Sequence, residues 1–325
     1  MAYYLGLDAG GTKTECALAH GSAILARASA GTIKIMRASH DEATEHLDIV
    51  LRSVVAQAGV ELNSIACTCV GLAGISVPRV ADWVSQALHA RVGGDLLLCG
   101  DVEIALDAAF CGGPGVLVMA GTGSNVVARS SDGRLIHIGG WGPALADEGS
   151  GIWIGKQAVR SIFEAQDRGE STQLLEKVLQ VWSLADLAGL IDVANQMPGP
   201  DFSKLTPLVV LCAEQGDPYA QRVLRQAGKE LGTYVSLALR RLQTAERPSV
   251  KLPEIAYTGS ILLQIATVQE AMRATIQQEF PDVRIQAKAI DPVEGALWRA
   301  RVRFESKSDV VRDTRNSASI DRPEM

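Results

Sequence analysis

Two short glycine-rich segments carry residue types that bind phosphate groups. The first reads Asp8-Ala-Gly-Gly-Thr-Lys-Thr14 and follows an apolar run. Its glycines let backbone N–H groups approach phosphate oxygens, its threonine hydroxyls add donors, and its lysine adds a positive charge. The residues concerned are Gly10, Gly11, Thr12, Lys13 and Thr14. Asp8 can hold Mg²⁺ through water, although a plain hairpin with glycine at positive φ also fits this string.

The second segment, Ala120-Gly-Thr-Gly-Ser-Asn125, is chemically similar and stands at a constant offset from the first. Gly11 corresponds to Gly123, and Thr12 corresponds to Ser124. Each copy is an apolar run, a tight turn and a second apolar run, followed by a hairpin signal at residues 20–22 or 132–133. This weak internal repeat predicts duplicated lobes with a ligand cleft between them. The phosphate-binding residues expected in the second turn are Gly121, Thr122, Gly123 and Ser124.

Asp101 stands where an apolar strand ends and a helix begins. The local sequence is Leu96-Leu-Leu-Cys-Gly-Asp-Val. A carboxylate in this place can accept the proton of a hydroxyl group that attacks a γ-phosphorus, and in phosphoryl transfer such a base mainly positions the nucleophile. The other role that fits is an N-cap, which is a frequent use of aspartate. The spacing leaves both roles open.

The elements that position these residues follow from hydrophobic periodicity. Strands are expected at residues 3–7, 65–70 and 95–98, and helices at residues 39–58 and from residue 101 to the glycine cluster at 112–115. The first helix opens with the capping box Ser39-His-Asp-Glu42 and ends before Gly59. We place the boundary between the two lobes at the glycine cluster.

The second half of the chain predicts a long helical region at residues 150–246. It is interrupted at Pro198-Gly-Pro200 and restarts at Asp217-Pro218. Strands are expected at residues 254–258 and 283–287, and a last helix from Asp291-Pro292. The predicted organisation is an N-terminal lobe at 1–114, a C-terminal lobe at 115–304 and a mobile polar tail at 305–325.

Composition excludes several classes of protein. The chain has 325 residues, 47% hydrophobic content and a net charge of -6 without a Lys/Arg cluster, so neither nucleic acid nor an anionic membrane is an expected partner. No apolar run reaches the roughly 18 residues of a membrane span and no leader precedes the first strand, which favours a cytoplasmic location. The six cysteines form no metal-binding pattern, and Cys67 and Cys69 are expected to be reduced core residues.

The segment Gly139-Gly-Trp-Gly-Pro-Ala-Leu-Ala-Asp-Glu-Gly-Ser-Gly-Ile-Trp-Ile154 resembles the GGWG, DEGS and W pattern of N-acetylglucosamine kinases. Together with the two glycine turns, it makes the chain similar, up to about residue 304, to these kinases and their BadF/BadG/BcrA/BcrD relatives. These proteins belong to the sugar kinase, heat-shock protein and actin superfamily. The resemblance implies an α/β fold of the two-lobed, actin-like and ribonuclease H-like type. It also implies ATP-dependent phosphorylation of an amino sugar, N-acetylglucosamine or glucosamine at the 6-hydroxyl, with ATP and Mg²⁺ as cofactors and a homodimer as a compatible assembly.

The resemblance assigns roles to single positions. It implies that Asp101 is the catalytic base, that the two glycine turns are phosphate loops, and that Gly259 and Ser260, in Tyr257-Thr-Gly-Ser260, bind ATP on the adenosine side. The residues implied to line the sugar are Asp101, Thr122, Gly139, Gly140, Asp147 and Glu148.

Two positions depart from the family pattern. The sugar loop of the family has an Asn after a Ser or Thr, whereas this chain reads Gly31-Thr-Ile-Lys-Ile-Met-Arg37 and has Ile33 there. Family members can also have a Ser where this chain has Ala73. A changed set of hydrogen bonds alters sugar preference and leaves phosphate chemistry intact. Lys34 and Arg37 on the same loop favour, as an alternative, a carboxylated substrate such as N-acetylmuramic acid, and another hexose also remains open.

Two further alternatives belong to other functional classes. One is the activator ATPase of an acyl-CoA dehydratase, which needs a cluster cysteine and usually a GGQD-type turn; neither is evident in the sequence. The other is a sugar sensor without catalysis. That reading is disfavoured because Asp8 leaves no room for a preceding helix-turn-helix and the CxCGxxGC zinc pattern is missing.

Overall fold

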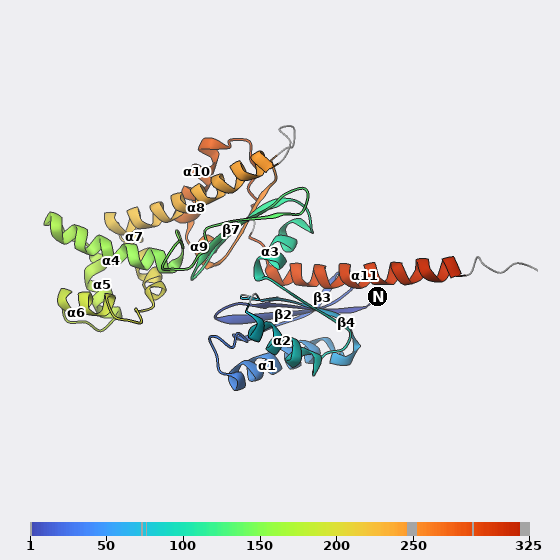
Figure 1. Ribbon diagram of the computed structural model, residues 1–325. Helices are drawn as coiled ribbons and strands as arrows, with labels where there is room; N and C mark the ends of the chain where they lie inside the picture. The colour runs from blue at the N-terminus through green and yellow to red at the C-terminus, as the bar shows by residue number, and fades with distance from the viewer. Residues whose placement is uncertain (1, 73, 76, 246–251, 288, 319–325) are drawn as a thin grey trace, which may run out of the picture. The chain divides into compact units, whose positions relative to one another are not determined.

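The computed structural model describes residues 2–72, 74–75, 77–245, 252–287 and 289–318, and the chain forms two compact units (Figure 1). The first unit comprises Met1–Gly113 and Ile290–Met325, and the second comprises Pro114–Ala289. The first boundary falls in the glycine cluster, where the sequence predicts it. The chain then returns to the first unit, so residues 290–304 do not belong to the C-terminal lobe to which the sequence analysis assigned them.

The first unit is built on a five-stranded sheet in the order β3-β2-β1-β4-β5. β1 runs antiparallel to β2 and parallel to β4, and β4 runs parallel to β5. The strands are β1 (Tyr3–Ala9), β2 (Lys13–His20), β3 (Ala23–Gly31), β4 (Ile65–Leu72) and β5 (Asp95–Cys99). The helices are α1 (His40–Ala58), η1 (Leu62–Ser64), α2 (Pro78–His89), α3 (Asp101–Phe110) and α11 (Pro292–Ala318). All elements expected in this part of the sequence are present, whereas α2 was not anticipated.

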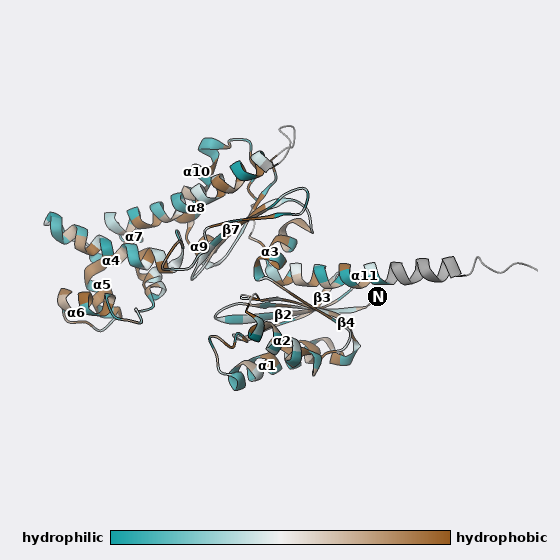
Figure 2. Ribbon diagram, viewed as in Figure 1, coloured by the Kyte–Doolittle hydropathy of each residue, from teal (hydrophilic) through white to brown (hydrophobic). Residues whose placement is uncertain are grey.

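Alternation of side chains along β1 gives this sheet two apolar faces. Leu5 and Leu7 pack in a core with α1 and α2, whereas Tyr4 packs in a second core with α3 and α11. Helix α1 carries hydrophilic and hydrophobic residues, both visible in Figure 2, and its buried side chains are Ala43, Leu47, Val50, Leu51 and Val54. Cys67 and Cys69 are free thiols buried in the second core, as predicted.

Helix α11 packs closely against the sheet and against α3. A Cβ added at Gly6 would lie 2.9 Å from the backbone nitrogen of Leu297, and one added at Gly295 would lie 1.8 Å from the carbonyl oxygen of Ile104. Glycine is therefore required at both contacts. The helix continues to Ala318, so residues 305–318, expected as a mobile tail, are helical. Residues 319–325 lie outside the described part of the chain.

The second unit is built on a four-stranded sheet in the order β8-β7-β6-β9. β6 runs antiparallel to β7 and parallel to β9. The strands are β6 (Gly115–Ala120), β7 (Ser124–Arg129), β8 (Leu135–Ile138) and β9 (Ile255–Thr258). A strand was also expected at residues 283–287, but the structure has only a single bridge there, between Ile255 and Ile285.

Helices make up most of the second unit. They are α4 (Gly151–Arg168), α5 (Gln173–Val181), α6 (Leu187–Ala194), η2 (Phe202–Leu205), α7 (Thr206–Glu214), α8 (Pro218–Ala245), α9 (Ser260–Gln264) and α10 (Ala266–Glu279). The predicted helical region is confirmed, with Ser150 as the N-cap of α4 and a restart at Pro218. Among the described residues, no helix combines the length and the apolar character needed to cross a membrane.

Each unit contains one strand-turn-strand segment of the kind that the internal repeat predicts. Ala9 pairs with Thr14 across the first turn, and Ala120 pairs with Ser124 across the second. The first turn is therefore one residue longer. Each turn follows the carboxyl end of a strand that has a parallel neighbour, β4 in the first unit and β9 in the second.

Candidate active site

Two carboxylates meet at one edge of the sheet of the first unit. β1 and β5 both run parallel to β4, so Asp8 near the end of β1 and Asp101 just after β5 lie at the same edge. Burial raises the pKa of Asp8 to about 7, and the negative charge of Asp101 adds to this shift. The carboxylates of Glu15 and Asp291 raise it further, whereas Lys13 opposes them. Asp8 thus lies in a negatively charged environment.

Asp101 is the first residue of α3 and not its N-cap. The N-cap is Gly100, whose N–H donates to Glu103 Oε2 at 2.8 Å. Asp101 Oδ1 accepts the N–H of Val102 at 3.0 Å. Burial raises the pKa of Asp101, while the hydrogen bond from Val102 and the positive charge of Lys34 oppose this shift. The N-cap role that the sequence left open is therefore wrong, and the role of a base stays open.

The first glycine turn is not a hairpin that needs glycine at positive φ. The N–H of Gly10 donates to the carbonyl of Lys13 at 3.0 Å, and neither glycine of the turn has a φ in the left-handed region. A Cβ added at Gly11 would meet no atom within 4 Å. Neither the backbone nor the packing explains the glycine at position 11. Close approach of a ligand, the reason for this glycine that the sequence analysis gave, stays a prediction. Thr12 and Lys13 are exposed on the same turn, and the Lys13 ammonium pairs with Glu15.

Thr14 does not face a ligand, contrary to the sequence expectation. Its side chain is fully buried, and its Oγ1 accepts the N–H of Ile33 at 3.1 Å. The side chain of Ile33 is also fully buried, in the core with α1, so it does not occupy the place of a sugar-binding amide. Thr32 donates from Oγ1 to the carbonyl of Gly10 at 2.7 Å. Residues 32 and 33 therefore brace the first turn. Ala73, the other departure, lies outside the described residues.

Lys34 is the residue of this loop that lies near Asp101. Its positive charge acts on the Asp101 carboxylate, and a Cβ added at Gly74 would lie 3.4 Å from its Nζ. The backbone N–H of Lys34 donates to Thr32 Oγ1 at 3.0 Å, which ties the loop to the first turn. Arg37 is exposed. Of the two cations that the sequence analysis singled out, only Lys34 is shown to act on Asp101.

The second glycine turn is held by the start of helix α4. The N–H groups of Gly151 and Ile152 donate to the carbonyls of Gly121 and Thr122, at 2.8 and 3.2 Å. The N–H of Gly121 donates to the carbonyl of Gly123 at 2.8 Å across the turn. First-turn N–H groups of α4, which have no partner within the helix, thus fix the shape of this turn.

Asp147 braces the second turn from inside the unit. Its Oδ1 accepts the N–H of Ser124 at 2.6 Å, and its Oδ2 accepts the hydroxyl of Ser150 at 3.1 Å. Burial raises the pKa of Asp147, and these hydrogen bonds oppose the shift. Ser124 is buried as well, and its hydroxyl donates to the carbonyl of Glu148 at 2.8 Å. Ser124 is therefore buried and bonded to the protein, and the Asp147 carboxylate accepts hydrogen bonds from the protein, while its contact with a sugar stays a prediction.

The implied sugar residues Gly139 and Gly140 are packed against side chains of the second unit. Both glycines have positive φ. A Cβ added at Gly139 would lie 2.5 Å from Cε2 of Tyr234, and one added at Gly140 would lie 2.8 Å from Cγ of Asn125. Tyr234 donates its hydroxyl to the carboxylate of Glu148. The segment that carries Glu148 is thereby anchored to helix α8.

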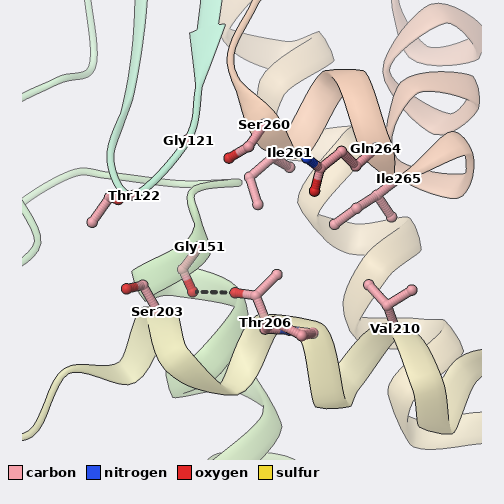
Figure 3. A pocket seen from close by; sticks show the side chains of 11 residues that line it. Gly121, Thr122, Gly151, Ser203, Thr206, Val210, Ser260, Ile261, Gln264 and Ile265 are labelled. Carbon is pink, nitrogen blue, oxygen red and sulfur yellow. Dashed lines mark hydrogen bonds between the residues drawn. The ribbon is translucent and has the colours of Figure 1, made fainter. Parts of the chain in front are cut away.

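A cavity of about 420 Å³ in the second unit joins the second turn to α9. Figure 3 shows residues of α9 above the cavity and residues of η2 and α7 below it. The lining residues are Gly121, Thr122, Gly151, Ser203, Thr206, Pro207, Val210, Ser260, Ile261, Gln264 and Ile265. Thr206 donates from Oγ1 to the carbonyl of Gly151 at 3.1 Å, which links α7 to the start of α4. Three residues expected to bind ATP, Gly121, Thr122 and Ser260, therefore line one cavity.

Gly259 allows the turn after β9 to approach the second glycine turn, which follows β6. β6 and β9 are parallel neighbours, so Ala120 and Gly259 lie at the same carboxyl edge. Gly259 has a φ of 98°, and an added Cβ would lie 2.3 Å from the carbonyl oxygen of Ala120. Only glycine fits this conformation and this close approach.

The sequence analysis missed the far wall of the cavity. Its residues on η2 and α7 are Ser203, Thr206, Pro207 and Val210. On the opposite side, the sequence also did not predict the lining residues Ile261, Gln264 and Ile265. They lie within or after a region that the sequence described only as helical, and no motif marks them. The proline at the second position of α7 was the one local signal, because it marks a helix start. Within the described residues, no group of three or more His, Cys, Asp or Glu side chains is arranged to hold a metal ion.

Comparison with known proteins places this geometry in a family. The model described as "BadF/BadG/BcrA/BcrD ATPase family" matches residues 5–298. The N-acetylmuramic acid/N-acetylglucosamine kinase of Clostridium acetobutylicum is 26% identical over 93% of this chain and 99% of its own length. The N-acetyl-D-glucosamine kinase of Dictyostelium discoideum is 26% identical over 91% of this chain and 97% of its own length.

Solved structures show the same architecture. A protein from Chromobacterium violaceum, assigned provisionally as an N-acetylglucosamine kinase, superposes with a TM-score of 0.68 at 28% identity, covering 91% of this chain and 98% of its own. A ROK family glucokinase from Streptomyces griseus has a TM-score of 0.58 at 14% identity, covering 93% and 99%. The second likeness concerns the fold alone. The predicted α/β, actin-like fold class is confirmed.

Replacement of Gly11 tests the first turn. In Gly11→Val, we expect normal folding, because a Cβ has free space there, and an ATP affinity lower by about tenfold or more, because the side chain blocks the approach of phosphate. Gly199→Val is the matched control, since this exposed glycine also lacks a positive φ and has no atom closer than 3.6 Å to an added Cβ. Calorimetry measures the affinity; an unchanged value in folded Gly11→Val would exclude the turn from phosphate binding.

Proposed function

The chain belongs to the BadF/BadG/BcrA/BcrD ATPase family, and from this premise we propose that it is a kinase that transfers the γ-phosphate of ATP to a hydroxyl group of an amino sugar. The observation that carries the proposal is the pair of carboxylates, Asp8 and Asp101, at one edge of the parallel strands beside an open glycine turn. The relatives that match nearly the whole chain are named as kinases of N-acetylglucosamine, N-acetylmuramic acid and glucosamine.

We assign the nucleotide to the cavity of the second unit. Its volume of about 420 Å³ suits a nucleoside, and Pro207, Val210 and Ile265 offer an apolar wall for a base. The amide of Gln264 and the hydroxyl of Ser260, both on α9, are polar groups that can orient the base and the sugar of the nucleoside. Thr122 at the other end of the cavity then lies on the phosphate side, where the turn is held by α4.

Asp101 acts as the base in this proposal. Its carboxylate accepts the proton of the attacking sugar hydroxyl and orients the oxygen toward the γ-phosphorus. Gly100 is the N-cap of α3, and Asp101 accepts the first-turn N–H of Val102 through Oδ1, so N-capping is not the role of this carboxylate. Burial raises the pKa of Asp101, and the nearby charge of Lys34 opposes this rise and so favours the ionised form, which is the form that accepts a proton.

Asp8 fits a role in holding Mg²⁺. Burial and the neighbouring carboxylates raise the pKa of Asp8 to about 7, so its ionised form is disfavoured without a compensating cation. Mg²⁺ bound through water would supply that positive charge and neutralise the phosphates of ATP. Asp8 is the only ligand that we assign from the chain, which agrees with the usual preference of Mg²⁺ for a few carboxylates, waters and phosphates.

A neutral amino sugar, N-acetylglucosamine or glucosamine phosphorylated at the 6-hydroxyl, is the first candidate substrate. The second candidate is a carboxylated amino sugar such as N-acetylmuramic acid. One observation favours it: the ammonium of Lys34 lies near Asp101 and against Gly74, where it can pair with a substrate carboxylate. A Clostridium acetobutylicum relative is named for both sugars.

Asp101→Asn tests the assignment of the base. We expect kcat to fall by about 100- to 10,000-fold with little change in ATP affinity, because the amide keeps the shape but cannot take the proton. Asp82→Asn, at an exposed position of α2, is the control and should keep its turnover. ADP release coupled to a sugar panel measures kcat. Near-normal turnover by Asp101→Asn would remove this residue from the mechanism.

Lys34→Met separates the two candidate substrates. If Lys34 pairs with a carboxylate, kcat/KM for N-acetylmuramic acid falls by about tenfold or more relative to that for N-acetylglucosamine, because a charge-assisted hydrogen bond is lost. Arg37→Met on the same loop should leave this ratio unchanged, because Arg37 is exposed. An equal loss for both sugars in Lys34→Met would show that Lys34 does not select an acid. No turnover or inhibition with N-acetylmuramic acid would rule this substrate out.

A further inference from the structure

A network of charged side chains joins α11 to the first turns of α3. Arg299 donates from Nε to Asp107 Oδ2 at 2.6 Å and from Nη1 to Glu103 Oε1 at 3.1 Å. The two carboxylates stand four residues apart on α3 and therefore share one face of the helix. A single guanidinium on the C-terminal helix thus bridges two positions of the helix that begins with Asp101.

The pair between Arg299 and Asp107 is the buried part of this network. The side chain of Asp107 is 1% exposed, and that of Arg299 is 27% exposed. Burial opposes the charge of Arg299, but Asp107, Cys99 and Glu103 together outweigh this effect and hold the pKa of Arg299 above its ordinary value. Arg299 is therefore charged over the working range of pH. Loss of one partner would leave a buried charge without this compensation.

Glu103 connects the network to Asp101. One of its carboxylate oxygens accepts from Arg299, and the other, Oε2, accepts the N–H of Gly100 at 2.8 Å. Gly100 immediately precedes Asp101, whose Oδ1 accepts the N–H of Val102 at 3.0 Å. The backbone on the amino side of Asp101 is thus tied, through Glu103, to α11.

Packing and the charged network together hold α3 in place. Ile104 of α3 lies against both α11 and β4. A Cβ added at Gly295 of α11 would lie 1.8 Å from the carbonyl oxygen of Ile104, and one added at Gly71 of β4 would lie 2.1 Å from Cδ1 of Ile104. These contacts set the distance of α3 from its neighbours. Rotation of α3 about its own axis is opposed by directional bonds, and Arg299 supplies two of them on one face.

We propose that Arg299 is a positioning residue for Asp101: through Glu103 it fixes the backbone at Gly100 and so directs the Asp101 carboxylate toward the sugar hydroxyl. This inference rests on the proposed role of Asp101 as the base. It gives the last helix of the chain a part in catalysis without any contact with the substrate.

Kinetics of matched variants test the proposal. Arg299→Met should lower kcat by about 10- to 100-fold with little change in KM for ATP, because a small misplacement of a reacting group costs on the order of 100-fold. Arg299→Lys keeps a charge beside Asp107 but has no planar fork for two carboxylates, so it should fold and show a partial loss. Arg91→Met is the control. It removes a guanidinium of similar exposure, which donates from Nε to Asp48 Oδ1 at 2.6 Å and joins the turn after α2 to α1, and it should keep its kcat.

Two further readouts separate positioning from general stability. In an Asp101→Asn background, Arg299→Met should lower the residual turnover by no more than about twofold, since both changes act on one step. A loss as large as in the parent enzyme would contradict positioning. Amide exchange at residues 100–104 should accelerate in Arg299→Met and not in Arg91→Met. Unchanged exchange there overturns the proposal without reference to activity, whereas absence of sugar phosphorylation by the unaltered chain overturns only the proposed function.

Discussion

The parallel register of β1, β4 and β5 is the constraint on which the proposed chemistry of the first unit depends. Parallel strands end at the same edge of a sheet, so a carboxylate near the end of β1 and one just after β5 are brought together although they are far apart in the sequence. This proximity disfavours the ionised form of Asp8, because burial and the negative charge of Asp101 raise its pKa to about 7. A site with this much negative charge is suited to a metal cation, and the phosphate groups of a nucleotide would enter it together with that cation.

The second unit uses the same constraint for another purpose. β6 and β9 end side by side, and the turns that follow them form one end of a cavity whose other wall comes from η2 and α7. Much of the hydrogen bonding around the second turn is internal: α4 donates to its carbonyls and Asp147 accepts from Ser124. A turn fixed in this way needs little reorganisation when a nucleotide binds, which is the condition for efficient electrostatic stabilisation.

The sequence predicted what depends on local pattern and short motifs. The capping box of α1, the two glycine turns, the strand ends at Asp8 and Asp101 and the start of α11 all follow from neighbouring residues. It failed where tertiary contacts decide. Thr14 and Ser124 look like phosphate-binding hydroxyls in the sequence, but both are buried and bond the protein itself. Ile33 is core, and α11 returns to the first unit because Gly6 and Gly295 admit it, which no motif announces.

In the proposed reaction the chain transfers phosphate to a sugar hydroxyl and not to water. Phosphorus NMR of a reaction with ATP, Mg²⁺ and N-acetylglucosamine, followed until a known amount of ADP has formed, measures this most directly. We expect one equivalent of a sugar phosphate monoester for each ADP, with inorganic phosphate below about a tenth of it, because a kinase must exclude water from the transfer. Release of inorganic phosphate in step with ADP, with every amino sugar tried, would contradict it.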